Sequence, residues 1–281
     1  MCMDEKMIGK RYHTVFSNHQ SGYIALMIES IRPASVKEAL LLFDRELLIK
    51  VKYITADMSR SMKNICAAVL PQACIVIDKF HVVKHLMEAL QSARLQVKKE
   101  IQTERKQQKE KQKEKKKETL LPGAASGNPN GWTDLELLEK TCCLLLRMHQ
   151  ELEEEDAFLP DFTLGKFPLL KTAYNLCQQL RLWYQPSSIG KNTGLLLAEL
   201  RRWKEKVKQE NIKEFLQVAR MMENHQTEII RYFENGLTNA KAENLNGKIQ
   251  RFIANNFGIR NRDFFLYRLQ VYFSPAPQKK I

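Results

Sequence analysis

Short apolar stretches in the N-terminal part of the chain predict β-strands. They are rich in β-branched and aromatic side chains, and the polar segment 18–22 has the composition of a hairpin turn. The stretch 73–77 is apolar without interruption, as expected of a strand that is buried on both faces. The predicted strands cover 11–17, 22–28, 51–56 and 73–77, with residues 1–3 as the stub of a first strand.

Apolar residues at helical spacing separate these strands. A first helix is predicted after Ser35, which is a suitable N-cap. Its apolar positions are Val36, Leu40, Leu41 and Leu47. A second helix is predicted over 60–70, where Ser59 caps the start and Pro71 stops the end. Strands and helices in this order indicate an α/β domain.

A long third helix starts at Phe80 and keeps an apolar stripe as far as Ile101. Residues 102–118 are almost all Lys, Glu, Gln and Arg, so this tract has no apolar side chains to pack on a core. It is either a solvated helix or a disordered segment. Residues 121–131 follow as a turn-rich linker.

The remainder of the chain is helical in pattern. The apolar pattern of residues 133–235 predicts an all-helical region, which proline residues interrupt. The predicted interruptions are Pro160, Pro168 and Pro186. Of two closing helices, one starts near Thr238 or Asn239 and runs to Asn256, with Gly258 as its stop, and the other covers about 262–273.

The order of elements predicts an α/β domain that is interrupted by a large all-helical insertion. The expected divisions are 1–95 for the first part of the α/β core, 96–235 for the charged tract, linker and helical insertion, and 236–281 for the closing part of the core.

The chain is strongly basic. Its 281 residues carry a formal net charge of +13, and the pI is near 9.4. This excess favours a polyanionic partner, with nucleic acid ahead of an anionic membrane. Because the Lys-rich tract supplies a good part of the excess, simple solubility remains an alternative.

Other classes of protein are excluded by what the sequence lacks. Its apolar runs are too short to span a bilayer, and it has no signal peptide. Its cysteines show neither a CxxC pair nor the Cys/His spacing of a zinc site. We therefore expect reduced thiols in a soluble cytosolic chain. The cysteines are Cys2, Cys66, Cys74, Cys142, Cys143 and Cys177.

Three aspartates stand at the ends of predicted strands. Asp57 and Asp78 directly follow strands, and Asp4 follows the stub. Ligands bind outside the carboxyl ends of strands in open α/β sheets. Carboxylates that converge there suit Mg²⁺, and two-metal phosphodiester cleavage needs such oxygens around ions about 3.5–4 Å apart. Taken alone, each aspartate is more simply a turn former.

Glu243 lies on the first closing helix. One face of that helix is apolar and is expected to meet the core, with Leu245, Ile249, Phe252 and Ile253. Another coherent face holds Glu243, Asn246, Gly247 and Gln250. A small polar face beside a sheet suits a metal and a DNA backbone, whereas a lone glutamate on a helix is commonly solvated.

Two segments of the chain stand out, residues 75–84 (IVIDKFHVVK) and residues 238–249 (TNAKAENLNGKI). The first looks like the DRFHV segment, and the second resembles the glutamate helix, of bacterial insertion-sequence transposases of the Asp-Asp-Glu class, in the ISL-three-like (ISL3-like) branch. Further segments resemble the same branch in the same order. The likeness reaches from residue 4 to about 273, so it covers most of the chain. The other similar segments are 4–6 with 12–15, 55–58, 70–73 and 257–261.

The resemblance implies a ribonuclease H-like mixed sheet interrupted by a large all-helical insertion. Asp4, Asp57 and Glu243 would be the catalytic residues and would bind two Mg²⁺ or Mn²⁺ ions. Double-stranded DNA, as transposon ends and target, would be the partner of a homodimer in the bacterial cytoplasm, with no membrane involved.

Three further residues are expected near this site. Asp78 and His81 match positions close to it in the family pattern, and Asn246 shares the face of Glu243. His81 either orients a carboxylate, contacts a phosphate, or is a structural, hydrogen-bonded histidine under the sheet.

The chain departs from the family pattern in two ways. Many relatives have an aspartate where this chain has Asn18, and if that acid were the functional one the chain would be inactive. We favour Asp4, because the Asp4-Glu5 pair precedes a hairpin. Only three residues precede Asp4, so we expect a nearly absent first strand, a missing upstream DNA-reading region, and a fragment or decayed copy as an alternative.

Basic and aromatic residues supply candidate DNA contacts. Lys248 and Arg251 lie on the glutamate helix, and Arg260 and Arg262 follow it. They either neutralise phosphates or are solvated. The three tryptophans either stack on an unpaired base or pack in a core, which is the usual role of aromatics at helical spacing. They are Trp132, Trp183 and Trp203.

Three hypotheses follow. The first is a metal-dependent transposase core that cleaves phosphodiesters and transfers strands. The second is a catalytically inactive DNA-binding remnant of such an enzyme. The third is a helical scaffold in which the acids have no chemical role.

Overall fold

The computed structural model describes residues 1–115, 127–255 and 261–274. The chain forms two compact units. A sheet unit comprises Met1–His81, Ile189–Lys191 and His225–Ile281, and a helical unit comprises Val82–Ser188 and Asn192–Asn224. In the described part of the chain, no helix combines the length and the apolar character that crossing a membrane requires.

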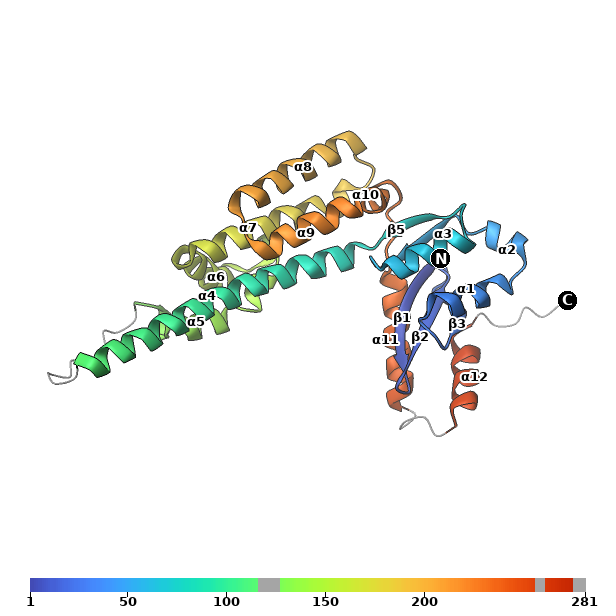
Figure 1. Ribbon diagram of the computed structural model, residues 1–281, viewed down its shortest axis with the longest axis horizontal. Coiled ribbons are helices and arrows are strands. Elements are labelled where there is room, and N and C mark those ends of the chain that lie inside the picture. Colours follow the sequence, from blue (N-terminus) through green and yellow to red (C-terminus); the bar gives the residue numbers. More distant parts are fainter. Residues whose placement is uncertain (116–126, 256–260, 275–281) are drawn as a thin grey trace. The chain divides into compact units, whose positions relative to one another are not determined.

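The sheet unit is built on five strands in the order β3-β2-β1-β4-β5 (Figure 1). The β3-β2-β1 side is antiparallel, and β4 and β5 run parallel to β1. The strands are β1 (Cys2–Ile8), β2 (Arg11–Ser17), β3 (Ile24–Ile28), β4 (Tyr53–Ala56) and β5 (Cys74–Ile77). The predicted hairpin and the two later strands are confirmed, with bounds that differ by a few residues.

The prediction of a nearly absent first strand is wrong. β1 continues through Asp4 and pairs with β2 along its whole length, from Cys2 opposite Ser17 to Ile8 opposite Arg11. The two residues between the strands, Gly9 and Lys10, both have positive φ angles of 55° and 66°. This backbone is that of a two-residue turn whose twist matches antiparallel strands, and it allows β1 and β2 to form a tight hairpin.

The sheet packs helices on both faces, because side chains alternate along each strand. One core contains Met3, Phe16 and Ile54 together with apolar residues of α1 (Pro33–Leu41) and α3 (Arg60–Val69). The opposite core contains Ile8 and Val15 with residues of α11 (Ala240–Asn255) and α12 (Arg262–Phe273). The expected apolar face of α11 is confirmed, since Leu245 and Ile249 are buried there and Phe252 and Ile253 pack against it.

The helices of the sheet unit correct some predicted boundaries. α1 starts at Pro33 rather than after Ser35, because proline fits the first helical position, where no backbone N–H is needed. Leu47 lies on a separate short helix, α2 (Arg45–Ile49). Ser59 occupies the N-cap position of α3 as predicted, but its side chain makes no capping hydrogen bond. α10 (Gln226–Asn235) completes the helices of this unit.

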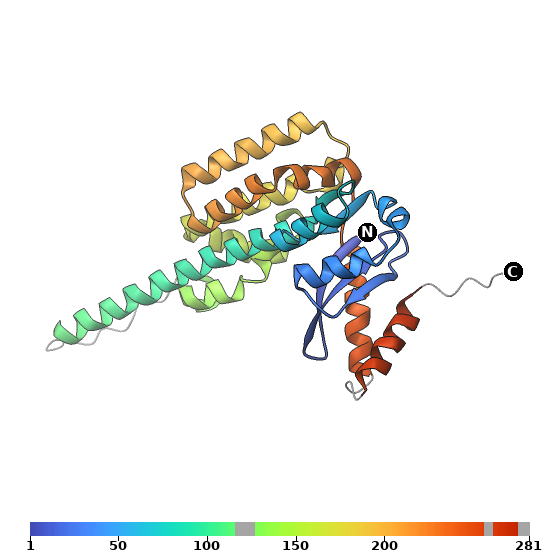
Figure 2. The same cartoon turned by 45° about the vertical axis from the view of Figure 1, so that its right-hand side comes forward.

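The helical unit begins within α4 (Lys79–Lys115), whose first residues belong to the sheet unit. The charged tract is helical as far as Lys115, and its remainder, like Gly258, lies outside the described residues. α7, α8 and α9 follow one another side by side (Figure 2). The helices are α5 (Asp134–Lys140), α6 (Glu154–Lys166), α7 (Pro168–Trp183), α8 (Thr193–Glu210) and α9 (Lys213–Asn224), with short 3₁₀ turns at Pro129–Gly131, Leu144–Leu146, His149–Glu151 and Pro186–Ser188.

Two of the three proline interruptions are confirmed. Pro168 starts α7, and Pro186 starts a 3₁₀ turn after that helix. Pro160 instead lies inside α6 and is buried, so the prediction of a break there is wrong. The helix loses one backbone hydrogen bond at the proline, and burial of its ring offsets part of that cost.

The tryptophans are mainly core residues. Trp183 and Trp203 are buried, and the indole of Trp203 donates a hydrogen bond to the carbonyl of Leu176 at 2.9 Å. The half-buried Trp132 has the Lys140 ammonium 6.0 Å from its ring centre. A core role therefore accounts for Trp183 and Trp203 without a nucleic-acid contact.

Candidate active site

Three aspartates lie at the same level of three adjacent strands. Cys2 of β1 is level with Thr55 of β4, which is level with Val76 of β5. Each of these three residues is followed, two positions later in the sequence, by an aspartate: Asp4, Asp57 and Asp78. Because neighbouring strands are about 4.8 Å apart, the register alone brings three carboxylates to one row at the carboxyl ends of β4 and β5.

Strand alternation also selects the face. Met3 points into the core under α1 and α3, so Asp4 points to the opposite face, where its cross-strand neighbour Val15 packs with α11. The same alternation on β4 buries Ile54 under α3 and turns Thr55 towards α11. The helix that carries Glu243 therefore covers the face on which Asp4 lies.

Asp4 is held by two hydrogen bonds. Its Oδ1 accepts from the backbone N–H of Glu5 at 2.8 Å, and its Oδ2 accepts from the side-chain amide of Asn246 on α11. Burial raises the pKa of Asp4, and the negative charge of Asp57 raises it further. Both hydrogen bonds oppose this shift, as does the charge of His81. The bond from Asn246 ties the glutamate helix directly to β1.

Asp78 is the most deeply buried of the acids, with 2% of its surface exposed. Its Oδ1 accepts from the backbone N–H of Asn239 at 3.2 Å, whereas its Oδ2 has no hydrogen-bond partner among the described residues. Burial raises the pKa of this carboxyl group, because the charged form loses its hydration. Asp78 thus presents an unsatisfied oxygen inside the site.

Asn239 is a site residue that the sequence reasoning did not identify. It is buried, and its side-chain oxygen accepts a hydrogen bond from the hydroxyl of Thr55. Its backbone N–H binds Asp78, and its carbonyl accepts from the N–H of Glu243 at 2.9 Å. One residue therefore joins the ends of β4 and β5 to the first turn of α11. An asparagine at a helix start suggests an ordinary cap, and nothing local shows that its side chain reaches β4 instead.

Glu243 belongs to the same electrostatic cluster. Partial burial raises its pKa, and the negative charges of Asp78 and Asp4 raise it further. The charge of His81 lowers the pKa values of Asp4, Asp78 and Glu243 alike. His81 is half-buried and lies at the start of α4, within electrostatic reach of these three acids.

Asp57 and Asn18 both form local turns. Asp57 is half-buried, and its Oδ1 accepts from the N–H of Ser59 at 2.9 Å, which leaves its other oxygen for the site. Asn18 is exposed, and its side-chain oxygen accepts from the N–H groups of Gln20 and Ser21 at 2.8 and 3.0 Å. Asn18 is thus occupied by the β2–β3 turn, whereas Asp4 is close enough to Glu243 for its charge to raise the pKa of that residue.

The acidic residues of the site are oxygen donors for a divalent ion. The raised pKa values of Asp4, Asp78 and Glu243 and the unsatisfied oxygen of Asp78 are features that a nearby cation would offset. Oxygen donors of this kind suit Mg²⁺ and Mn²⁺. Within the described ranges, however, no three His, Cys, Asp or Glu side chains are close enough together to hold a metal. The residues fit such an ion in chemistry, and their side chains have to close around it.

The expected DNA contacts lie elsewhere. Lys248 and Arg251 line a groove between α11, α12 and the β2–β3 turn, on a different face of α11 from Glu243. Arg262 forms an ion pair with Glu29. Arg260 lies outside the described residues.

Comparison with known protein families matches the chain to the ISL3 family. The model of this family, which is described as "Transposase", matches residues 1–269. The match includes Asp4, Asp57 and Glu243. No curated protein and no solved structure matches the chain.

The Thr55–Asn239 hydrogen bond is expected to stabilise the sheet unit. Asn239→Ala leaves the buried hydroxyl of Thr55 without a partner, which should cost about 1–3 kcal/mol. Thr55→Val should recover part of this loss in the Asn239→Ala background, because both polar partners are then removed. Amide hydrogen exchange of β4, β5 and α11 measures the effect, since all three tryptophans lie in the helical unit. Strictly additive effects of the two substitutions would contradict the contact.

The stability of the sheet unit should depend on the charge of Asp78. Because burial raises its pKa, folding disfavours the ionised form, and each tenfold gain in its proton affinity on folding costs about 1.4 kcal/mol of stability at neutral pH. Asp78→Asn should therefore increase the free energy of unfolding at pH 7. The gain should vanish below the ordinary pKa of 3.8, where Asp78 is protonated in both the folded and the unfolded chain.

Urea unfolding followed by circular dichroism between pH 3.5 and 7.5, without metal, measures this difference. Glu38→Gln, at an exposed position of α1, is the matched control. A loss of stability in Asp78→Asn at pH 7 would contradict the prediction.

Proposed function

We propose a reaction for this chain on the premise that it belongs to the ISL3 family of transposases, whose model matches residues 1–269. As a transposase it acts on DNA. In the proposal, the sheet unit is the catalytic core, and Asp4, Asp57 and Glu243 bind two Mg²⁺ or Mn²⁺ ions for phosphodiester cleavage and strand transfer at insertion-sequence ends.

The observation that carries the proposal is the contact between Asn246 and Asp4. It brings the helix of Glu243 onto β1, across 242 residues of sequence. The pKa values of Asp4 and Glu243 are each raised by burial and by neighbouring negative charge. Carboxylates placed in this way repel one another, so a bound cation would stabilise the arrangement.

Each residue has a distinct part in the proposed reaction. The chemistry supplied by the two ions, when bound, is activation of the attacking water or 3′-hydroxyl and stabilisation of the leaving oxygen. Asn246 orients Asp4 through its amide, and Asn239 fixes the first turn of the helix that carries Glu243. His81, when protonated, favours the ionised forms of the neighbouring acids.

The finer features of fold and setting belong to the same proposal. We infer a ribonuclease H-like core from the mixed sheet, which the helical unit interrupts between Asp57 and Glu243. The division into 1–95, 96–235 and 236–281 stays a prediction. The partner would be double-stranded DNA, bound by a homodimer in the bacterial cytoplasm, with any upstream DNA-reading region supplied separately.

A catalytically inactive remnant is the alternative function. One observation favours it: within residues 1–115, 127–255 and 261–274, no three metal-ligating side chains are close enough to hold an ion. Such a protein would keep the fold and the DNA contacts without cleaving DNA.

Removal of any one acid should abolish cleavage. Asp4→Asn, Asp57→Asn and Glu243→Gln should each lower the rate of nicking of supercoiled plasmid by roughly 10³-fold or more. The double variants should be no worse than the single ones, because the residues act as a unit. Conversion to open circles on agarose gels with Mg²⁺ or Mn²⁺ measures the rate, and chelation of the metal should stop it.

Glu234→Gln, on the exposed surface of α10, serves as the control and should keep the full rate. A full-length, folded wild-type chain that binds the plasmid but does not nick it would favour the inactive remnant. Nicking that survives in Glu243→Gln would rule out the proposed triad.

A further inference from the structure

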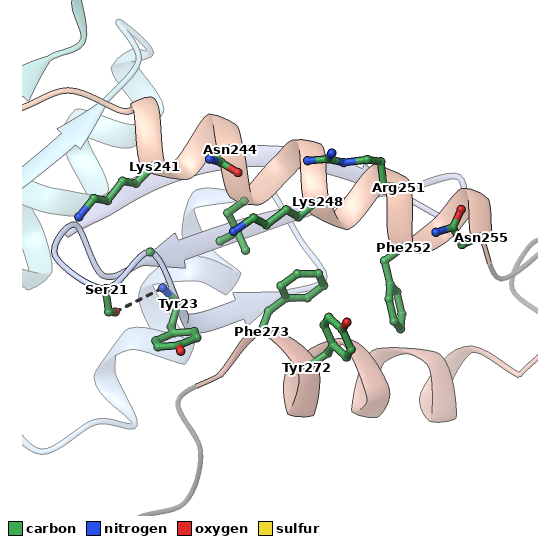
Figure 3. Close-up of a pocket in the computed structure, with 12 residues that line it drawn as sticks. Ser21, Tyr23, Lys241, Asn244, Lys248, Arg251, Phe252, Asn255, Tyr272 and Phe273 are labelled. Atoms are coloured by element: carbon green, nitrogen blue, oxygen red, sulfur yellow. Dashed lines mark hydrogen bonds between the residues drawn. The ribbon is translucent and has the colours of Figure 1, made fainter.

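The sheet unit has a groove apart from the acids, between α11, α12 and the turn that joins β2 to β3. Its volume is about 730 Å³. Figure 3 shows residues that line it. Among the residues that the structure describes, those that line it include no Asp or Glu.

One wall of the groove is cationic. Lys241 and Lys248 recur on one face of α11 and extend over the groove, and the exposed Arg251 lies at its edge (Figure 3). Lys241 also donates to the carbonyl of Gln20 in the β2–β3 turn, which fixes its direction. Exposed cations without acidic partners in the same groove favour a phosphate-bearing ligand.

The other wall is aromatic. Tyr272 is 69% exposed and Tyr23 is 43% exposed, so both rings offer surface to a ligand. Tyr272 is held in place from behind, because its ring centre lies 5.4 Å from that of Phe252 and 5.2 Å from that of Phe273. A fixed, exposed ring beside a row of cations is the arrangement that binds single-stranded nucleic acid, in which base faces are free to stack.

The groove is distinct from the proposed cleavage site. Glu243 and Asn246 lie on another face of α11, where Asn246 binds Asp4. A strand in the groove would therefore be held by α11 without meeting the acids through the same side chains. Binding in the groove can be measured without cleavage, so it is testable even if the proposed triad is wrong.

We propose that this groove binds an unpaired segment of DNA, with its phosphates against Lys241, Lys248 and Arg251 and a base stacked on Tyr272 or Tyr23. Duplex DNA fits the groove less well, because its base faces are already stacked on one another. The groove thus recognises DNA in an opened form, at a position set by the helix that carries Glu243.

The test uses the full chain, a fluorescein-labelled eight-nucleotide oligo-dT and fluorescence anisotropy, with EDTA present. Lys248→Gln with Arg251→Gln should weaken binding roughly tenfold and reduce the slope of log affinity against log salt by about 1.4. Arg201→Gln with Lys208→Gln, which removes the same charge from exposed positions of α8, should change neither as much.

Base stacking is tested separately. Tyr272→Ala should weaken binding by roughly 5- to 100-fold, whereas Tyr272→Phe keeps the ring and should bind almost as tightly as the wild type. An oligonucleotide with abasic positions should lose affinity for the wild type and should be insensitive to Tyr272→Ala. Thermal unfolding of each variant verifies that it is folded.

The outcomes separate the two proposals. The proposal for the groove would be overturned by unchanged binding in the charge variant, by equal binding of the abasic strand, or by duplex binding that is as sensitive to Tyr272→Ala as single-strand binding. Asp4→Asn and Glu243→Gln should keep full oligonucleotide binding. Loss of nicking in these variants with intact binding would then concern the triad alone.

Discussion

Repulsion between carboxylates is the constraint on which this structure depends. Asp4, Asp57 and Asp78 come from three adjacent strands, and Glu243 approaches them from a helix. Burial raises the pKa values of Asp4, Asp78 and Glu243, and the charges of neighbouring acids raise those of Asp4 and Glu243 further. Such a cluster is unfavourable by itself, so contacts with the surrounding residues have to hold the acids together.

A few long-range hydrogen bonds, most of them between side chains, hold the acids together. Asn239 joins β4, β5 and the first turn of α11, and Asn246 joins α11 to β1. Both residues are uncharged, so they add no further repulsion. The same contacts leave one oxygen of Asp78 without a hydrogen-bond partner among the described residues. Its burial is unfavourable, and a bound cation would offset that cost.

Two faces of α11 carry side chains with different proposed roles. One face carries Glu243 and Asn246 towards the acids, and another carries Lys241 and Lys248 over the aromatic groove. Between them, Leu245 and Ile249 anchor the helix in the core. Because α11 is a single rigid element, DNA held in the groove would be held in a fixed relation to the carboxylates.

Much of the fold was predictable from local patterns. The strands before Asp57 and Asp78 are short apolar runs, and the apolar stripe of α11 is regular, so both could be found by counting. The full length of β1 was not predicted, because the charged residues from Asp4 to Lys6 interrupt its apolar pattern. The strongest sign of this strand is the turn at Gly9 and Lys10. A helix break was predicted at Pro160 and is not observed, because α6 accommodates this proline in a buried position.

The candidate site was only partly predictable. Position after a strand marked Asp57 and Asp78, but the likeness to a family was needed to select Glu243 from the many exposed glutamates. Asn239 and the groove could not be predicted. The contacts of Asn239 join residues 161 and 184 positions apart, and the groove depends on the packing of three elements. Spacing along a chain carries no information about such contacts.

The most direct test of the proposed metal site is anomalous scattering from crystals of the full-length chain grown with Mn²⁺. Peaks that are coordinated by oxygens of Asp4, Asp57 and Glu243 are the predicted result. A well-ordered structure in which Glu243 turns away from both aspartates, with no manganese between them, would contradict it.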